Sequence, residues 1–155
     1  MIVIGLGGNV GGAPAIVERF RRAREALHGI RSAPLYCSAA LGPPQPEYLN
    51  TAISIGDDWL PAGLIAFVLE IELLLGRDRR GEERWGPRAI DLDVLVWGER
   101  TIDIPGLTVP HPRIAERRFV LLPLIALGAQ VPGLDLESAA RRVRDQAVSE
   151  ISTDW

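Results

Sequence analysis

The stretch of this chain that is most informative about its fold runs from Arg84 to Trp97 and reads RWGPRAIDLDVLVW. Its second half is rich in β-branched and large apolar residues, which predicts an extended strand over residues 90–97. Side chains on a strand alternate between its two faces, so Asp91 and Asp93 share one face. The sequence therefore predicts a strand with one apolar face and one face that carries two carboxylates.

The two carboxylates indicate a metal site. Side chains two residues apart on one face repel each other when both are charged, and a hard cation between them removes the repulsion. Mg²⁺ is bound in this way, by one or two carboxylates together with substrate phosphates. The arginines just upstream, Arg84 and Arg88, can hold phosphate oxygens through forked, charge-assisted hydrogen bonds. Spacing alone leaves a second interpretation open, a solvated acidic strand beside a salt-bridged arginine loop.

Length and composition predict one domain over residues 1–155. Apolar residues make up 47% and charged residues 24% of the chain, as in ordinary globular proteins. No apolar run approaches the roughly 20 residues that span a bilayer, so no membrane partner is expected. Met1–Leu6 is interpreted as a first strand and not as a signal peptide. The chain has a single cysteine, Cys37, which excludes an internal disulfide and makes a cytoplasmic location the expected one. Cys37 itself is expected to be a core residue and not a nucleophile.

The charge pattern narrows the possible functions. The net charge is −3, so no general attraction to nucleic acid is expected. All 17 basic residues are arginine, which excludes both the lysine of a phosphate-binding P-loop and Schiff-base chemistry. Any phosphate must therefore be held by arginine, backbone amides or a metal ion.

Periodicity and turn residues predict an alternation of strands and helices with paired short strands. Strands are expected over Met1–Leu6, Arg31–Ala40, Tyr48–Ile55, residues 90–97 and near Thr101, helices over Pro14–Leu27, Pro61–Leu75 and Leu136–Val148, and turns or loops over residues 7–12, 41–47, 77–87 and 107–112. The segment Phe119–Leu127 is apolar nearly all round and is expected to be buried. Such a pattern is typical of an α+β sandwich, in which helices pack against one mostly antiparallel sheet.

Four blocks of sequence, in this order, resemble the 6-hydroxymethyl-7,8-dihydropterin pyrophosphokinase family. They are Gly7-Gly8-Asn9, Tyr48-Leu49-Asn50, the ten residues Arg84–Asp93, and Leu107–His111 followed by Arg117 and Phe119. The resemblance extends from Met1 to about Leu127. It implies a ferredoxin-like fold and an ATP-dependent enzyme of tetrahydrofolate synthesis. Such an enzyme moves the β,γ-diphosphate of ATP onto the pterin hydroxymethyl oxygen and releases AMP.

The resemblance also implies roles for individual residues. The matching positions are Asp91 and Asp93 for two Mg²⁺ ions, Arg77 and Arg88 together with these aspartates for catalysis, Leu41, Tyr48, Asn50 and Phe119 for the pterin, and Glu72, Arg79, Arg84, Trp85, Thr108, His111 and Arg117 for ATP. Tyr48 and Phe119 are expected to sandwich the pterin ring. Trp85 is expected to cover the site when the loop over residues 77–87 closes. A monomer is expected, with ATP and the pterin as its partners.

Two alternatives use the same residues. A Mg²⁺-dependent nucleotidyl transferase or nuclease would also need Asp91 and Asp93, and could stack a base on the two aromatic residues, but the acidic net charge disfavours a long nucleic acid. A non-catalytic ligand-binding module of the same fold is disfavoured because the carboxylates and arginines occur together. For the pyrophosphokinase we expect catalysis by positioning and charge neutralisation in an in-line displacement, without a strong protein base.

Overall fold

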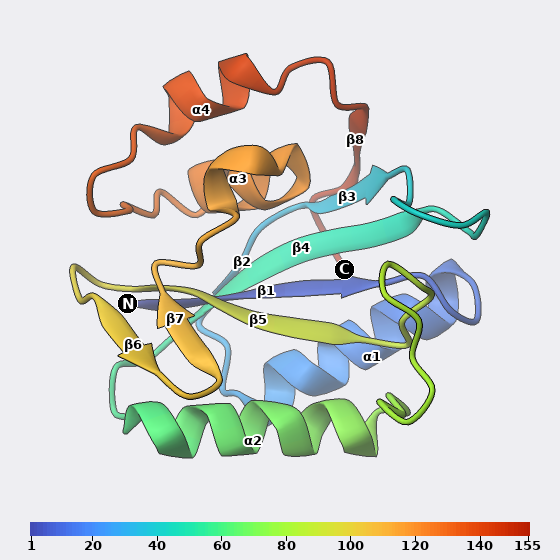
Figure 1. Ribbon diagram of the computed structural model, residues 1–155, viewed down its shortest axis with the longest axis horizontal. Helices are drawn as coiled ribbons and strands as arrows, with labels where there is room; N and C mark the ends of the chain where they lie inside the picture. The colour runs from blue at the N-terminus through green and yellow to red at the C-terminus, as the bar shows by residue number, and fades with distance from the viewer.

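An antiparallel sheet runs through the middle of the protein, in a computed structural model that describes residues 1–155 (Figure 1). Its strands follow the order β5-β1-β4-β3-β8, and the short β2 also pairs with β4. A separate two-stranded hairpin, β6-β7, lies beside one end of the sheet. The strands are β1 (Ile2–Gly8), β2 (Arg31–Ser32), β3 (Leu35–Ser38), β4 (Tyr48–Ile55), β5 (Asp91–Trp97), β6 (Ile102–Ile104), β7 (Leu107–Val109) and β8 (Val148–Ser152).

Helices cover both faces of the sheet (Figure 1). They are α1 (Ala13–Ala26), α2 (Pro61–Leu74), α3 (Arg118–Ala126) and α4 (Leu136–Arg142), with a single 3-10 turn η1 (Ile114–Glu116) before α3. In Figure 1, α1 and α2 lie below the sheet and α3 and α4 above it. None of these helices combines the length and the apolar character that crossing a membrane would require.

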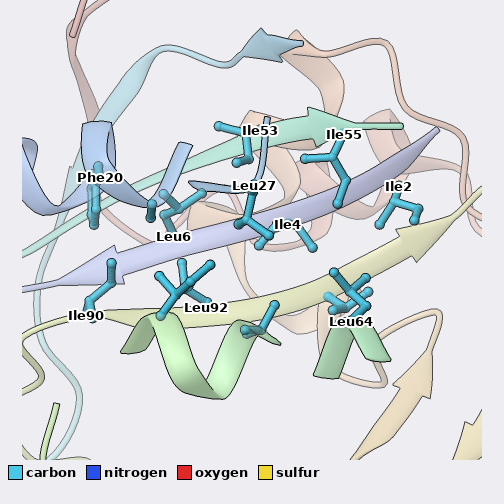
Figure 2. Packing of buried hydrophobic residues seen from close by; sticks show 14 of the residues in the cluster. Ile2, Ile4, Leu6, Phe20, Leu27, Ile53, Ile55, Leu64, Ile90 and Leu92 are labelled. Atoms are coloured by element: carbon cyan, nitrogen blue, oxygen red, sulfur yellow. The ribbon is translucent and has the colours of Figure 1, made fainter. Parts of the chain in front are cut away.

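The larger of two hydrophobic cores lies between the sheet and helices α1 and α2, and Figure 2 shows part of it. Proline in the first turn starts each helix. The predicted stripe of α1, from Ile16 through Phe20 and Ala23 to Leu27, is buried in this core. Helix α2 stops before Gly76, whose φ of 98° is a left-handed conformation that glycine adopts without strain.

The smaller core lies on the opposite face, between the sheet and helices α3 and α4. Alternation along β5 divides its side chains between the two cores. Leu92 and Val94 point into the larger core, whereas Leu95 points into the smaller one. Asp91 and Asp93 therefore lie on the α3 side of the sheet, which confirms that they share one face.

Several predicted boundaries differ from the structure. Strand β1 continues through Gly7 and Gly8, which were expected in a turn, because both pair with β4. A Cβ atom on Gly8 would lie 2.8 Å from the carbonyl oxygen of Ala89, so this close approach favours glycine. The expected strand over Arg31–Ala40 is divided into β2 and β3 around Pro34, which has no N–H to donate to a sheet.

The C-terminal prediction was wrong in two respects. Helix α4 ends at Arg142 and not at Val148, and residues 148–152 form β8, which pairs with the edge strand β3. Residues 107–109, expected as part of a bend, form β7. In both cases the strand exists because it pairs with a partner strand, which local periodicity does not reveal.

Candidate active site

A cavity of about 340 Å³ opens on the α3 side of the sheet. Its floor is formed by β1, where the glycines at positions 5 and 7 present no side chains, and by β5 with Asp91 and Asp93. The segment of η1 and α3 supplies one wall, with Arg117 and Phe119. The loops over residues 39–47 and 77–90 supply the opposite side. Ten of the predicted site residues line it: Leu41, Tyr48, Asn50, Arg84, Trp85, Arg88, Asp91, Asp93, Arg117 and Phe119.

The two aspartates differ in their surroundings. The Asp91 carboxylate forms an ion pair with Arg77, and its side chain is 39% exposed. Asp93 is more deeply placed and has no basic partner in hydrogen-bond contact. Burial, followed by the charge of the Asp91 carboxylate, raises the pKa of Asp93 to about 7. A cavity that holds two carboxylates at this cost is suited to a cation.

The side chains of Arg77 and Glu72 do not line the cavity, but they bind to strand β5, which forms part of its floor. Both are buried, and Arg77 Nη1 donates to Glu72 Oε1 at 2.9 Å while Arg77 Nε donates to Glu82 Oε1 at 2.9 Å. Glu72 Oε1 also accepts the backbone N–H of Leu92, at 2.8 Å, and so connects α2 to β5. Arg79 donates to the other Glu72 oxygen at 2.6 Å. The predicted residues Glu72, Arg77 and Arg79 thus form one ion-pair network that holds Asp91 from behind.

Four arginines line the cavity: Arg84, Arg88, Arg113 and Arg117. The backbone of Arg88 is fixed by the buried Asn9, which accepts from its N–H at 2.9 Å and donates to its carbonyl at 3.0 Å. The Nε of Arg117 is buried without a hydrogen-bond partner. Burial, followed by the neighbouring charge of Arg113, lowers the pKa of Arg117. The excess positive charge of these arginines and the unpaired donor of Arg117 make this part of the lining suited to an anion.

Aromatic and amide groups also line the cavity. The Tyr48 hydroxyl donates to the carbonyl oxygen of Gly86 at 2.8 Å, which fixes its ring beside the loop. The buried Asn50 donates from Nδ2 to Ser38 Oγ at 2.8 Å. Its Oδ1 lies at the cavity floor, 3.4 Å from where a Cβ on Gly7 would be. This carbonyl oxygen is therefore placed to accept a hydrogen bond from a flat polar ligand.

The loop that carries Trp85 is folded against the cavity. Gln45 Nε2 donates to the Trp85 carbonyl at 2.6 Å, and the guanidinium carbon of Arg113 lies 4.9 Å from the centre of the indole ring. A Cβ on Gly42 would lie 2.7 Å from the Cβ of Trp85, so the two loops are in close contact. Trp85 itself has a φ of 64°, which is uncommon for a large residue. This strained position is consistent with a functional loop.

The remaining predicted residues lie outside the cavity. Thr108 is exposed on β7, and its hydroxyl donates to Asp103 at 3.3 Å. His111 accepts the backbone N–H of Arg113 on Nδ1 at 3.2 Å, and burial lowers its pKa.

Cys37 is half-buried next to the larger core, and its thiol donates to Glu47 at 3.1 Å. Burial, followed by that hydrogen bond, raises the pKa of Cys37 to about 11, which opposes a role as nucleophile.

Comparison with known proteins assigns the family. The model of the family described as 7,8-dihydro-6-hydroxymethylpterin-pyrophosphokinase (HPPK) matches residues 3–129. The chain belongs to this family. The predicted family is thereby confirmed.

Three bacterial HPPK relatives carry the name 2-amino-4-hydroxy-6-hydroxymethyldihydropteridine pyrophosphokinase. The protein from Synechocystis is 39% identical over 125 residues, which cover 79% of this chain and 63% of the relative. The protein from Pseudomonas aeruginosa is 40% identical over 114 residues, covering 73% of this chain and 68% of the relative. The protein from Methylorubrum extorquens is 38% identical over 125 residues, covering 78% of each. This chain thus spans less than two thirds of the first relative.

A solved structure confirms the HPPK fold. The HPPK-DHPS of Plasmodium falciparum, crystallised with SDX-DHP, superimposes with a TM-score of 0.58 at 12% identity. The match covers 92% of this chain and 43% of the other. Together with the antiparallel sheet and its helices, it confirms the prediction of a ferredoxin-like α+β fold.

Sequence reasoning missed several residues of this HPPK cavity. Gly5 and Gly7 were not singled out as its floor, although alternate glycines in a strand indicate a close approach on one face. Arg113 lines the cavity and contacts Trp85. Asn9 belongs to one of the four blocks of the resemblance but was given no role; it does not line the cavity but joins three loops, since it also donates to Gln45 Oε1 and the Pro46 carbonyl at 2.9 Å. Arg113 carries no local signal, because its contact is with a loop 28 positions earlier in the sequence.

Proposed function

We propose that this protein transfers the β,γ-diphosphate of ATP to 6-hydroxymethyl-7,8-dihydropterin and releases AMP, as a step of tetrahydrofolate synthesis. One observation carries the proposal: a single cavity is lined by aromatic and amide groups and also by two aspartates and several arginines. The first set of groups suits a flat polar ring and the second a metal–polyphosphate. The names of the related proteins support this choice of pterin.

The pterin is proposed to lie between Tyr48 and Phe119, with Leu41 at its edge. A ring stacked on an aromatic face gains about 0.5–1.5 kcal/mol beyond the burial of its area. Asn50 would read the polar edge of the ring through Oδ1, because its Nδ2 already donates to Ser38. A ligand N–H opposite this oxygen would be bound, and a ligand carbonyl there would be rejected.

The triphosphate is proposed to lie along Arg84, Arg88 and Arg117, which line the same cavity. Arg77 would contribute positive charge from behind Asp91, in the buried network with Glu72. Arg79, Thr108 and His111 do not line the cavity, and they are proposed as further contacts of the nucleotide. Trp85 would close over the bound triphosphate.

Asp91 and Asp93 fit Mg²⁺ by the chemistry of their donors. Both supply carboxylate oxygens on one face of β5, and no group of three or more histidine, cysteine or acidic side chains forms a complete metal cage. An incomplete set is what Mg²⁺ uses when substrate phosphates complete its shell. When bound, Mg²⁺ would neutralise the charge of the triphosphate and so favour attack on phosphorus; two ions are proposed.

The proposed step is an in-line displacement. The hydroxymethyl oxygen attacks the β-phosphorus, the bond from that phosphorus to the oxygen of the α-phosphate breaks, and AMP leaves with the hydroxyl proton on its phosphate. The protein would act by positioning, since the cavity is lined by no histidine and no free cysteine. Closure of Trp85 over the substrates would exclude water and so prevent hydrolysis of ATP.

The test is an assay of AMP in mixtures of protein, Mg-ATP and 6-hydroxymethyl-7,8-dihydropterin. AMP is expected only when both substrates and Mg²⁺ are present. Formation of ADP in place of AMP would contradict the proposed reaction, as would AMP formation at the same rate without the pterin. That residues 1–155 form one domain, and that the protein is a cytoplasmic monomer, remain predictions.

A further inference from the structure

The helix that carries one wall of the cavity has no capping side chain of its own. Helix α3 begins at Arg118, and the residue before it, Arg117, is extended with a φ of −124° and a ψ of 105°. No side chain of the preceding turn accepts a hydrogen bond from the first N–H groups of the helix. Arg117 and Phe119, on either side of Arg118, both line the cavity.

Gln146 supplies the missing cap from a distant part of the chain. Its Oε1 accepts the backbone N–H of Arg118 at 2.9 Å, and its Nε2 donates to the carbonyl oxygen of Glu116 at 2.8 Å. The main-chain carbonyl of Gln146 accepts from Arg118 Nη1, also at 2.9 Å. One side chain therefore binds the backbone on both sides of Arg117.

Gln146 is itself held in place. It lies between α4 and β8, outside residues 3–129 that match the family model. Strand β8 pairs with β3, with Val148 opposite Ser38, and the indole of Trp155 donates to the carbonyl of Ala33 at 2.8 Å. The chain that follows Gln146 is therefore anchored to the sheet, and a residue held in this way can fix the position of the residues that it binds.

Arg117 has little else to fix it. Its Nε is buried and unpaired, and no ion pair holds its guanidinium. Its nearest interaction is with the ring of Phe119, whose centre lies 5.8 Å from the guanidinium carbon. The orientation of both side chains therefore depends on the backbone from Glu116 to Phe119. Gln146 binds this backbone in addition to the main-chain hydrogen bonds that Arg117 makes with Ile114, Val120 and Leu121.

We infer that Gln146 is a positioning residue, which fixes Arg117 and Phe119 for binding of the phosphate and the aromatic ring of the substrates. The inference rests on the proposed function, because that function gives the two side chains their ligands. Gln146 touches neither substrate. It acts through the two hydrogen bonds that bracket Arg117.

The test compares Gln146→Ala with Gln146→Glu and with the control Gln130→Ala, which removes an exposed glutamine from the turn after α3. Without substrates, hydrogen exchange at the Arg118 amide should be about tenfold faster in Gln146→Ala, the effect of one lost hydrogen bond. Gln146→Glu keeps an acceptor for this amide and should exchange like the wild type. Gln130→Ala should also be unchanged.

Kinetics then separate positioning from general stability. In Gln146→Ala, KM for the pterin should rise about fivefold or more with kcat changed less than about twofold, because a binding wall is displaced. Loss of thermal stability with an unchanged KM would overturn the inference, as would wild-type exchange at Arg118. If the wild type forms no AMP, the proposed function fails while the exchange result still decides whether Gln146 fixes this backbone.

Discussion

Asp93 is the residue at which function and stability are most clearly opposed. Its pKa is raised to about 7, first by burial and then by the charge of Asp91, so its ionised form is disfavoured in the folded protein. A free aspartate has a pKa of about 3.9. The folded protein therefore loses stability as the pH rises from about 4 to about 7, and the whole loss is present above that range.

The substitution Asp93→Asn tests both sides of this opposition. Without Mg²⁺ at pH 8, it should stabilise the fold by about 1 kcal/mol or more, because the amide carries no charge to bury. The gain should disappear near pH 4, where Asp93 is protonated. In the presence of Mg²⁺ and both substrates, the same variant should lose more than about tenfold in activity, roughly 1.4 kcal/mol of barrier.

Thermal unfolding at pH 4 and pH 8, together with the AMP assay, would measure these effects. The neighbouring substitution Asp91→Asn is the control for stability, since it breaks the ion pair with the buried Arg77 and should destabilise the fold at pH 8. Activity of Asp93→Asn above a tenth of the wild type would show that the metal assignment is wrong.

At the scale of residues, alternation along one strand was enough to predict that Asp91 and Asp93 share a face. The family resemblance named about half of the residues that line the cavity. Arg113 and Gln146 could not be found in the same way, because their partners Trp85 and Arg118 are distant in the sequence and are brought near by the fold. A local pattern carries no information about such contacts.

At the scale of elements, the loop over residues 77–87 holds four arginines and three acidic residues. In this structure its charges are paired mainly with one another and with Glu72, while Gln45 and Arg113 hold Trp85. Because triphosphate would compete for these arginines, we expect the loop to rearrange when nucleotide binds.

Trp85 fluorescence would report this rearrangement. A non-hydrolysable Mg-ATP analogue with the pterin should change the emission of the wild type, and Trp85→Phe should lack most of that change. The comparison leaves Trp97 and Trp155 in place, which is necessary because both are buried. An equal change in both proteins, at concentrations shown to saturate binding, would contradict a closing loop.

Strand β8 and Trp155 form a second element with a testable role. The Trp155 ring packs edge-on against Phe20, with centroids 6.0 Å apart, and its indole N–H donates to Ala33. Trp155→Ala should therefore cost about 3 kcal/mol, the lower end for a large core aromatic, in the free energy of unfolding. Chemical denaturation would measure this cost, and a loss below about 1 kcal/mol would show that β8 is only weakly attached. The variant Trp85→Phe, at a half-buried position in a loop, serves as a control.

The elements show where sequence reasoning succeeds. Tyr48–Ile55 and the helices that begin near Pro14 and at Pro61 were predicted nearly as observed, because alternation and proline in the first turn are local signals. The end of α4 and the existence of β8 were missed. The helical periodicity extends to residue 148, but residues 143–147 form a turn and coil that lead into β8. Strand β8 exists through its pairing with β3, a strand more than 100 positions earlier, which local periodicity does not reveal.

At the scale of the whole molecule, one sheet separates two cores with different roles. The larger core, between the sheet and helices α1 and α2, contains most of the apolar side chains of β1, β4 and β5. The cavity opens on the other side, between the sheet and α3, where glycines of β1 and aspartates of β5 replace apolar side chains. The continuous core on one face of the sheet thus offsets the stability that the polar cavity on the other face costs.

The position of the phosphate label after reaction with β-phosphate-labelled ATP tests the central claim most directly. Protein, Mg²⁺, labelled ATP and 6-hydroxymethyl-7,8-dihydropterin are incubated and the products separated, with Asp93→Asn as the control. The account predicts the label in the pterin diphosphate, unlabelled AMP, and little product from Asp93→Asn. Label in ADP would indicate transfer of a single phosphate, and label in free pyrophosphate would indicate nucleotidyl transfer or hydrolysis; either result would contradict it.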